Sequence, residues 1–142
     1  MSNLRTRLRA DTRIAHDRVD AAFGRFNMEQ PAGYLGFLTA QYRALSGLAT
    51  FSCDAQDMLL RVDRDFDVLR TSCPSGLPFS RRVDPVALEY ILLGSRLGLA
   101  SMFRTFQSGR SVGATAEFLS TPVDPLRWRS FCTELAALPA TG

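Results

Sequence analysis

Apolar residues recur every third or fourth position through most of this chain, a spacing that predicts α-helices rather than strands. Five segments show it, at about residues 3–23, 31–51, 55–69, 84–106 and 125–138. A further short helical piece is predicted at residues 114–119, before Pro122. Asp84 and Asp124 each precede a proline, which is typical of a capped helix start. The pattern predicts a single all-α helical bundle spanning residues 1–142, with no internal repeat or linker.

Composition and cysteine usage narrow the class of protein. Of 142 residues, 46% are hydrophobic and 22% charged, as in an ordinary globular domain. No apolar run approaches the roughly 20 residues that span a bilayer, and the Arg-rich start lacks the apolar core of a secretory signal. Cys53, Cys73 and Cys132 are widely spaced, so we expect semi-buried free thiols rather than disulfides or zinc ligands. These features favour a cytoplasmic protein with no membrane contact.

The charged residues exclude several chemistries. All 17 basic residues are Arg, so lysine nucleophiles, Schiff bases and the P-loop lysine are absent. Acidic and basic residues alternate along most of the chain, so no nucleic-acid-binding stripe is predicted. The alternating carboxylates of residues 63–67 lack the Gly and Glu that a calcium loop needs, and we predict a solvated helix face there.

His16 is the only imidazole in the chain. Helical spacing places it on or beside an apolar face of the first segment, away from the charged side that holds Arg9, Arg13 and Asp17. A desolvated imidazole needs a partner for at least one ring nitrogen. It is therefore either a core histidine bonded to a neighbour or an axial ligand to a metal cofactor beside the helix.

Gly94 and Gly98 lie four residues apart inside an otherwise strong helix. Each glycine costs a helix interior about 1 kcal/mol relative to alanine, so a pair needs a reason. One reason is close approach of a second helix. The other is a flat ligand lying against exposed backbone, with room above it for a small diatomic molecule.

These features occur within short motifs that resemble haem oxygenases, in particular the bacterial branch linked to bacteriophytochromes. Leu8-Arg9 with Thr12 and His16 resembles the LR-x-x-T-x-x-x-H pattern of the proximal helix. Residues 34–38 resemble the opening of the next helix, and residues 90–98 resemble the distal helix. Phe118 and residues 128–131 resemble later aromatic positions of the same branch.

The resemblance implies a haem oxygenase-like fold with haem between the first helix and the distal helix. It implies that His16 ligates the iron and that Arg9 and Arg13 bind the propionates. The distal residues implied for the oxygen side and the haem face are Tyr90, Gly94, Ser95, Leu97 and Gly98. The implied reaction opens haem to biliverdin and releases iron and carbon monoxide. It uses dioxygen and electrons from a ferredoxin or a flavoprotein reductase.

Three departures keep other interpretations open. Leu99 stands where the branch has a second glycine, and we expect its side chain to narrow the distal pocket. Leu93 replaces an acidic residue, and the chain ends soon after the Trp128 segment, where the family continues into another helix. A haem- or tetrapyrrole-binding protein without efficient turnover is the first alternative. The second is a helical interaction module without a cofactor. A homodimer is a further expectation, because it would cover an exposed apolar face.

Overall fold

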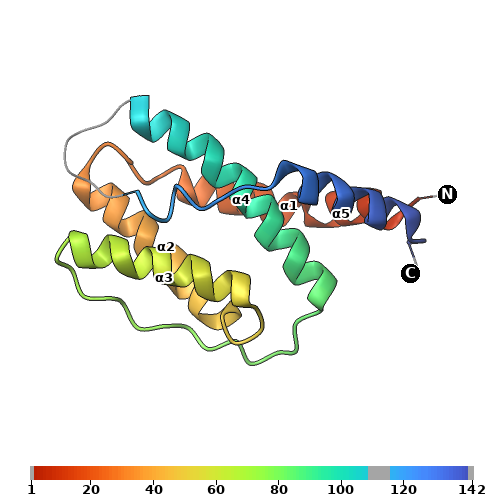
Figure 1. The fold of residues 1–142 in the computed structure, drawn as a ribbon, viewed down its shortest axis with the longest axis horizontal. Helices are drawn as coiled ribbons and strands as arrows, with labels where there is room; N and C mark the ends of the chain where they lie inside the picture. Colours follow the sequence, from red (N-terminus) through yellow and green to blue (C-terminus); the bar gives the residue numbers. More distant parts are fainter. Residues whose placement is uncertain (1, 109–115, 141–142) are drawn as a thin grey trace. The chain divides into compact units, whose positions relative to one another are not determined.

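The computed structural model describes residues 2–108 and 116–140, and the regular structure of these residues is entirely α-helical (Figure 1). The helices are α1 (Leu4–Phe23), α2 (Pro31–Leu48), α3 (Cys53–Val68), α4 (Pro85–Ser108) and α5 (Pro125–Ala137). The five predicted helices are therefore confirmed, with ends shifted by up to three residues. The predicted turn at Gly109 and Gly113, and the first two residues of the predicted piece at 114–119, lie outside the described residues. Residues 117–120 form a turn.

Side-chain caps explain where several of these helices begin. Asn3 accepts a hydrogen bond from the Thr6 backbone N–H at 2.9 Å, and Asp124 does the same for Leu126 at 3.1 Å. The start of α3 differs from the prediction by two residues. Ser52 Oγ accepts from the backbone N–H of Ala55 at 3.3 Å, so the helix begins at Cys53.

The chain groups into two compact units, which are described separately. The terminal unit comprises Met1–Arg25 and Asp124–Gly142, and the central unit comprises Phe26–Val123. The terminal unit thus contains α1 and α5, and the central unit contains α2, α3 and α4. The organisation of the whole chain as one domain stays a prediction.

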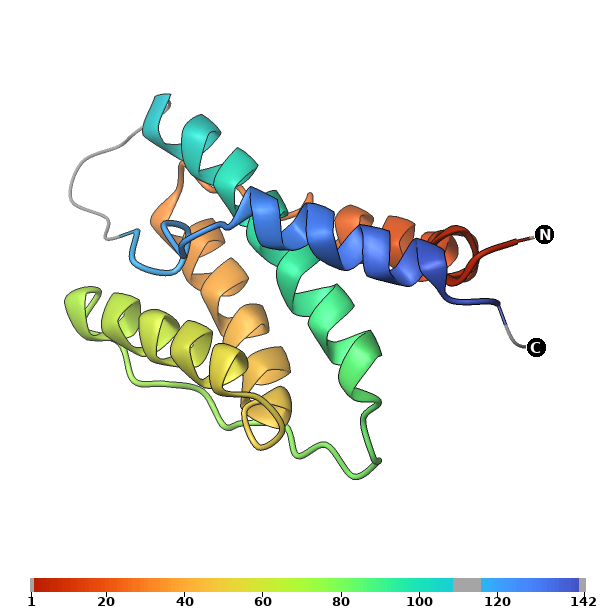
Figure 2. The ribbon, with the colours of Figure 1, turned by 45° about the vertical axis from the view of Figure 1, so that its right-hand side comes forward.

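The core of the central unit forms around α2 and α3, which lie side by side (Figures 1 and 2). The bulkiest fully buried side chains come from these two helices and from the turn at residues 117–120. They are Tyr34, Phe37, Leu38, Met58, Val62, Asp65, Phe66, Phe118 and Leu119. Aromatic contacts join the segments, including Phe37 with Phe118 at a centroid distance of 6.1 Å.

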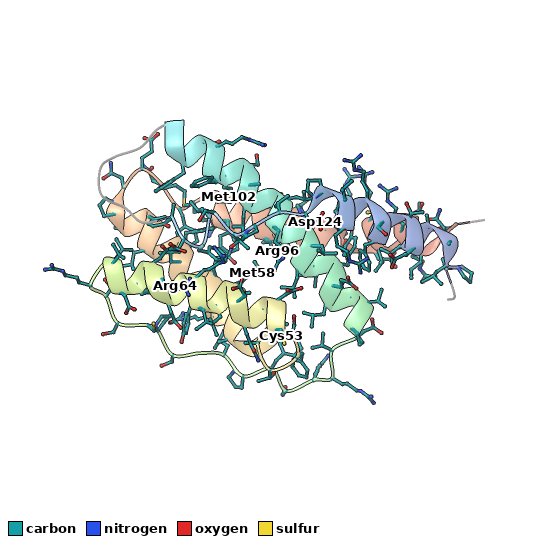
Figure 3. The ribbon with its side chains drawn as sticks, in the orientation of Figure 1. Cys53, Met58, Arg64, Arg96, Met102 and Asp124 are labelled. Carbon is teal, nitrogen blue, oxygen red and sulfur yellow. The ribbon has the colours of Figure 1, made fainter. Side chains whose placement is uncertain are left out.

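One side of α4 contributes to the same core. Leu88, Leu92 and Leu99 are buried. The Phe106 ring stacks on Tyr34 of α2 at 5.2 Å between centroids. Arg96 Nη2 lies 3.3 Å from Asp54 Oδ1 of α3, and Figure 3 shows Arg96 beside α3. These contacts define which side of α4 faces α2 and α3.

The apolar character of α4 corrects one expectation from the sequence. Residues Pro85–Phe106 are long and apolar enough to cross a membrane, by length and composition alone. Core helices of soluble proteins satisfy the same criterion when they are mostly buried, whereas 22% of this window is buried here. In this structure the buried leucines and the Arg96–Asp54 ion pair attach the helix to the central unit.

The terminal unit pairs α1 with α5. The Leu4 backbone N–H donates to the Leu138 carbonyl at 3.0 Å. Phe131, Cys132 and Leu135 of α5 are buried, whereas no residue of α1 is. The apolar face predicted for the first helix is therefore largely exposed. The prediction of free thiols is confirmed for all three cysteines. Their predicted partial burial is wrong, because Cys53 and Cys73 are exposed and Cys132 is buried.

Candidate functional site

His16 lies in the middle of α1, and its side chain is 73% exposed. Its Nδ1 atom is 3.1 Å from Oδ2 of Asp20, one helical turn further along. The expectation of a desolvated histidine on an apolar face is therefore wrong. The face is not covered, because α1 buries none of its residues in the part of the chain that the structure describes.

The side of α1 around His16 is charged. Arg9, Arg13, His16 and Asp20 follow one another at intervals of three or four residues, so they share one side of the helix. All four residues are exposed. Arg13 Nε also lies 4.0 Å from Oδ2 of Asp17. The sequence interpretation that separated His16 from this charged side is corrected accordingly.

This arrangement fits a metal-binding imidazole. Histidine ligands almost always donate their second ring N–H to a carboxylate, a carbonyl or water, which fixes the tautomer and makes the ligating nitrogen more basic. When Nδ1 of His16 donates to Asp20, the lone pair is on Nε2. The imidazole is largely exposed, so this nitrogen can accept a bond to a ligand. The two arginines are cations suited to carboxylates of the same ligand.

The predicted distal residues share one side of α4. Tyr90, Gly94, Leu97 and Gly98 occur at helical intervals, on a side of α4 other than the one that carries the buried leucines. A Cβ added at Gly98 would meet no atom within 4 Å. Close packing of a second helix therefore does not explain Gly98 within the described residues. Ser95 Oγ donates to the Ile91 carbonyl at 2.7 Å, so the hydroxyl proton of Ser95 is hydrogen-bonded to the backbone of its own helix.

Leu99 does not lie on the glycine side of α4. It is buried with Leu88 and Leu92, about 100° around the helix from Gly98. The expectation that its side chain narrows a pocket above the glycines is therefore wrong. Leu99 belongs to the apolar core.

The predicted site is divided between the two units. Arg9, Arg13 and His16 are brought together on α1 in the terminal unit. Tyr90, Gly94, Leu97 and Gly98 are brought together on α4 in the central unit, while Ser95 points its hydroxyl back to its own helix. Each group is thus described as a surface of its own helix.

A buried carboxylate in the central unit was missed by the sequence analysis. Asp65 is fully buried, although the run at residues 63–67 was predicted to be solvated. Its Oδ1 accepts the Glu117 backbone N–H and its Oδ2 accepts that of Phe118, both at 3.0 Å. The Tyr34 hydroxyl donates to Oδ2 at 3.3 Å. We call these four residues the Asp65 cluster.

The Asp65 cluster is structural rather than catalytic. A buried carboxylate is stable only when it is well hydrogen-bonded, and two backbone N–H groups and a phenol meet that need. Burial, followed by the charge and hydrogen bond of Asp65, raises the pKa of Tyr34 well above its usual value. The signal in the sequence was the position of Asp65, which falls in the apolar series of Met58, Val62 and Phe66.

Comparison of the chain with protein-family models, with curated proteins and with solved structures finds no match.

Proposed function

We propose that this protein binds haem through His16 and opens the porphyrin ring of the haem as haem oxygenases do. The observation that carries the proposal is the exposed His16 imidazole, with Nδ1 held 3.1 Å from the Asp20 carboxylate. A ring oriented in this way presents Nε2 as an axial ligand. The motifs that resemble the proximal and distal helices of that family add the reaction.

The chain's own groups divide the remaining work. Asp20 orients the imidazole, and Arg9 and Arg13 on the same side of α1 bind the anionic propionates. The side of α4 that carries Gly94 and Gly98 is the predicted wall of the oxygen side. Bound haem would supply the iron that activates oxygen. A ferredoxin or a flavoprotein reductase would supply the electrons.

The position of Leu99 bears on turnover. Its predicted crowding of the oxygen side is one of two sequence arguments for a non-catalytic protein, the other being the short segment after Trp128, and Leu99 instead lies in the core. The Gly98 backbone has open space beside it. Both observations support a protein able to admit dioxygen.

Haem binding without efficient turnover is the second candidate. The exposure of His16 favours it, because no residue of α1 is buried and water reaches the imidazole freely. Oxygen activation at haem generally needs a site from which water is excluded. The two candidates share the ligand and differ in the reaction of the reduced complex with oxygen.

A hemin titration tests the ligand. The wild-type protein should give a Soret band of histidine-ligated haem. His16→Ala should lose that spectrum and bind hemin more weakly. Arg18→Ala is the matched control, because it is exposed on the opposite side of α1 and should titrate like wild type. Identical titrations of wild type and His16→Ala would overturn the proposal.

Reduction of the hemin complex separates the two candidates. Under carbon monoxide, the reduced complex should give a stable spectrum in either case. In air with an electron donor, haem oxygenase activity should bleach the Soret band and release a bilin. A carbon monoxide complex that releases no bilin in air would favour the binding protein. Absence of any hemin binding would favour an interaction module without a cofactor.

A further inference from the structure

The linker between α3 and α4 is held against α2 by close backbone contacts. Ser46 Oγ of α2 accepts the Leu77 backbone N–H at 3.0 Å. A Cβ at Gly47 would lie 2.9 Å from the Leu77 carbonyl oxygen, and one at Gly76 would lie 2.8 Å from Ser46 Oγ. A Cβ at Gly47 would therefore force the backbone of the linker to move, and one at Gly76 would displace the Ser46 side chain. Residues 76–79 of the linker, which is green in Figure 1, therefore lie against α2.

This part of the linker and the turn after α2 present large apolar side chains to solvent. Leu77 is 58% exposed, Phe79 is 51% exposed, and Phe51 in the turn after α2 is 44% exposed. The rings of Phe51 and Phe79 contact each other edge to face, with centroids 6.5 Å apart. Grouped apolar exposure of this kind marks an interaction surface more often than a chance arrangement.

The same linker carries unpaired positive charge. Residues 70–83 contain Arg70, Arg81 and Arg82 and no acidic residue. Arg81 and Arg82 are exposed, and no ion pair holds either of them within the described chain. Asp84, the next carboxylate along the chain, is occupied, because its Oδ1 accepts the backbone N–H groups of Val86 and Ala87.

We propose that the protein binds an anionic phospholipid surface through one group of residues, which we call the Phe79 patch. The Phe79 patch consists of Phe51, Leu77, Phe79, Arg81 and Arg82. The Phe and Leu side chains enter the boundary between headgroups and acyl chains, and the two arginines contact lipid phosphates. This function is independent of haem binding and reverses the sequence expectation of no membrane contact.

The size of the Phe79 patch favours a lipid surface over an acidic protein. A specific protein interface buries about 800 Å² on each partner and involves some 20–30 residues. The Phe79 patch offers three apolar side chains and two free cations. That is the combination by which peripheral proteins attach to anionic membranes, where apolar burial and electrostatic attraction add.

Co-sedimentation with lipid vesicles tests the proposal. The intact protein should pellet with vesicles of phosphatidylcholine and phosphatidylglycerol, more weakly with phosphatidylcholine alone, and less as salt is added. The Arg81→Gln/Arg82→Gln variant should bind the anionic vesicles about 30-fold more weakly, from the attraction of roughly 1 kcal/mol for each arginine near the surface. Leu77→Ser/Phe79→Ser should also lose binding.

Matched controls come from α1. Ile14→Ser removes an exposed apolar side chain and Arg18→Gln removes an exposed charge, both outside the Phe79 patch, and both should bind like wild type. Circular dichroism and urea unfolding check that each variant is folded. Wild-type protein that stays in the supernatant with anionic vesicles would overturn the proposal. So would unchanged binding of the folded double-arginine variant, and an acidic protein would then become the favoured partner.

Discussion

The Nδ1 atom of His16 lies 3.1 Å from Oδ2 of Asp20, and both side chains are largely exposed on α1. The pair is local, because residues four apart on a helix are neighbours. Both partners lie on α1, so the pair forms without a contribution from another helix.

The first prediction concerns Asp20. Asp20→Ala should keep His16 as the ligand but weaken hemin binding by about tenfold, the lower end of the range for groups that orient a metal ligand. Asp20→Asn should lose less, because the amide oxygen still accepts from Nδ1–H. Competition with a haem-binding protein measures the affinity. Asp11→Ala is the control, since Asp11 pairs with Arg7, which takes no part in the proposed site.

The helices were predictable because their signals are local. Asp84 with Pro85 and Asp124 with Pro125 begin α4 and α5 where the cap and proline pattern predicts. The start of α3 was missed by two residues because the Ser52 cap was overlooked. A capping side chain bonds to backbone groups of its own helix, so the amino-acid sequence around the helix start is enough to predict it.

The environments of single side chains were harder to predict. Asp65 was assigned to solvent because its neighbours along the chain are charged, yet its partners Glu117 and Phe118 are more than 50 residues away. His16 was assigned to an apolar face, but its spacing from Arg9 and Arg13 places it on the charged side of α1, and periodicity does not show whether another element covers a face. Burial depends on tertiary contacts that a single helix does not encode.

The second prediction compares adjacent residues of α4. Gly98→Ala should raise the free energy of unfolding by about 1 kcal/mol, because a Cβ there meets open space and alanine favours the helix. Leu99→Ala should lower it by about 2–5 kcal/mol, because it leaves a cavity in the core. Urea denaturation measures both. A destabilised Gly98→Ala would show that the glycine side is closely packed.

The third prediction concerns Cys73. Desolvation and then the Asp63 carboxylate, whose Oδ1 lies 2.9 Å from the thiol, raise the pKa of Cys73 to about 11. Thiolate is the reactive form, so this exposed cysteine should alkylate slowly at mildly alkaline pH. Asp63→Asn should accelerate its reaction with iodoacetamide, as measured by peptide mass spectrometry. Asp67→Asn, whose charge acts more weakly on Cys73, should accelerate it less.

The last prediction uses the Asp65 cluster. The pKa of Tyr34 is raised above its ordinary 10.0 by burial, then by the Asp65 charge and hydrogen bond. The folded protein therefore keeps the phenol proton more tightly than the unfolded chain does. The stability that depends on this proton is fully present below the unfolded pKa of about 10 and is lost as pH rises toward the folded value. The wild type should accordingly begin to lose stability between pH about 9 and about 11.

Tyr34→Phe isolates this contribution. At neutral pH it should cost about 1.5–3 kcal/mol, the value of a hydrogen bond to a charged group. Between pH about 9 and about 11 its unfolding free energy should fall less than that of wild type, because the titrating phenol is gone. Tyr42 and Cys73 also titrate with raised pKa values, but they are present in both proteins and cancel in the comparison. Equal alkaline losses in the two proteins would show that Tyr34 does not couple to folding.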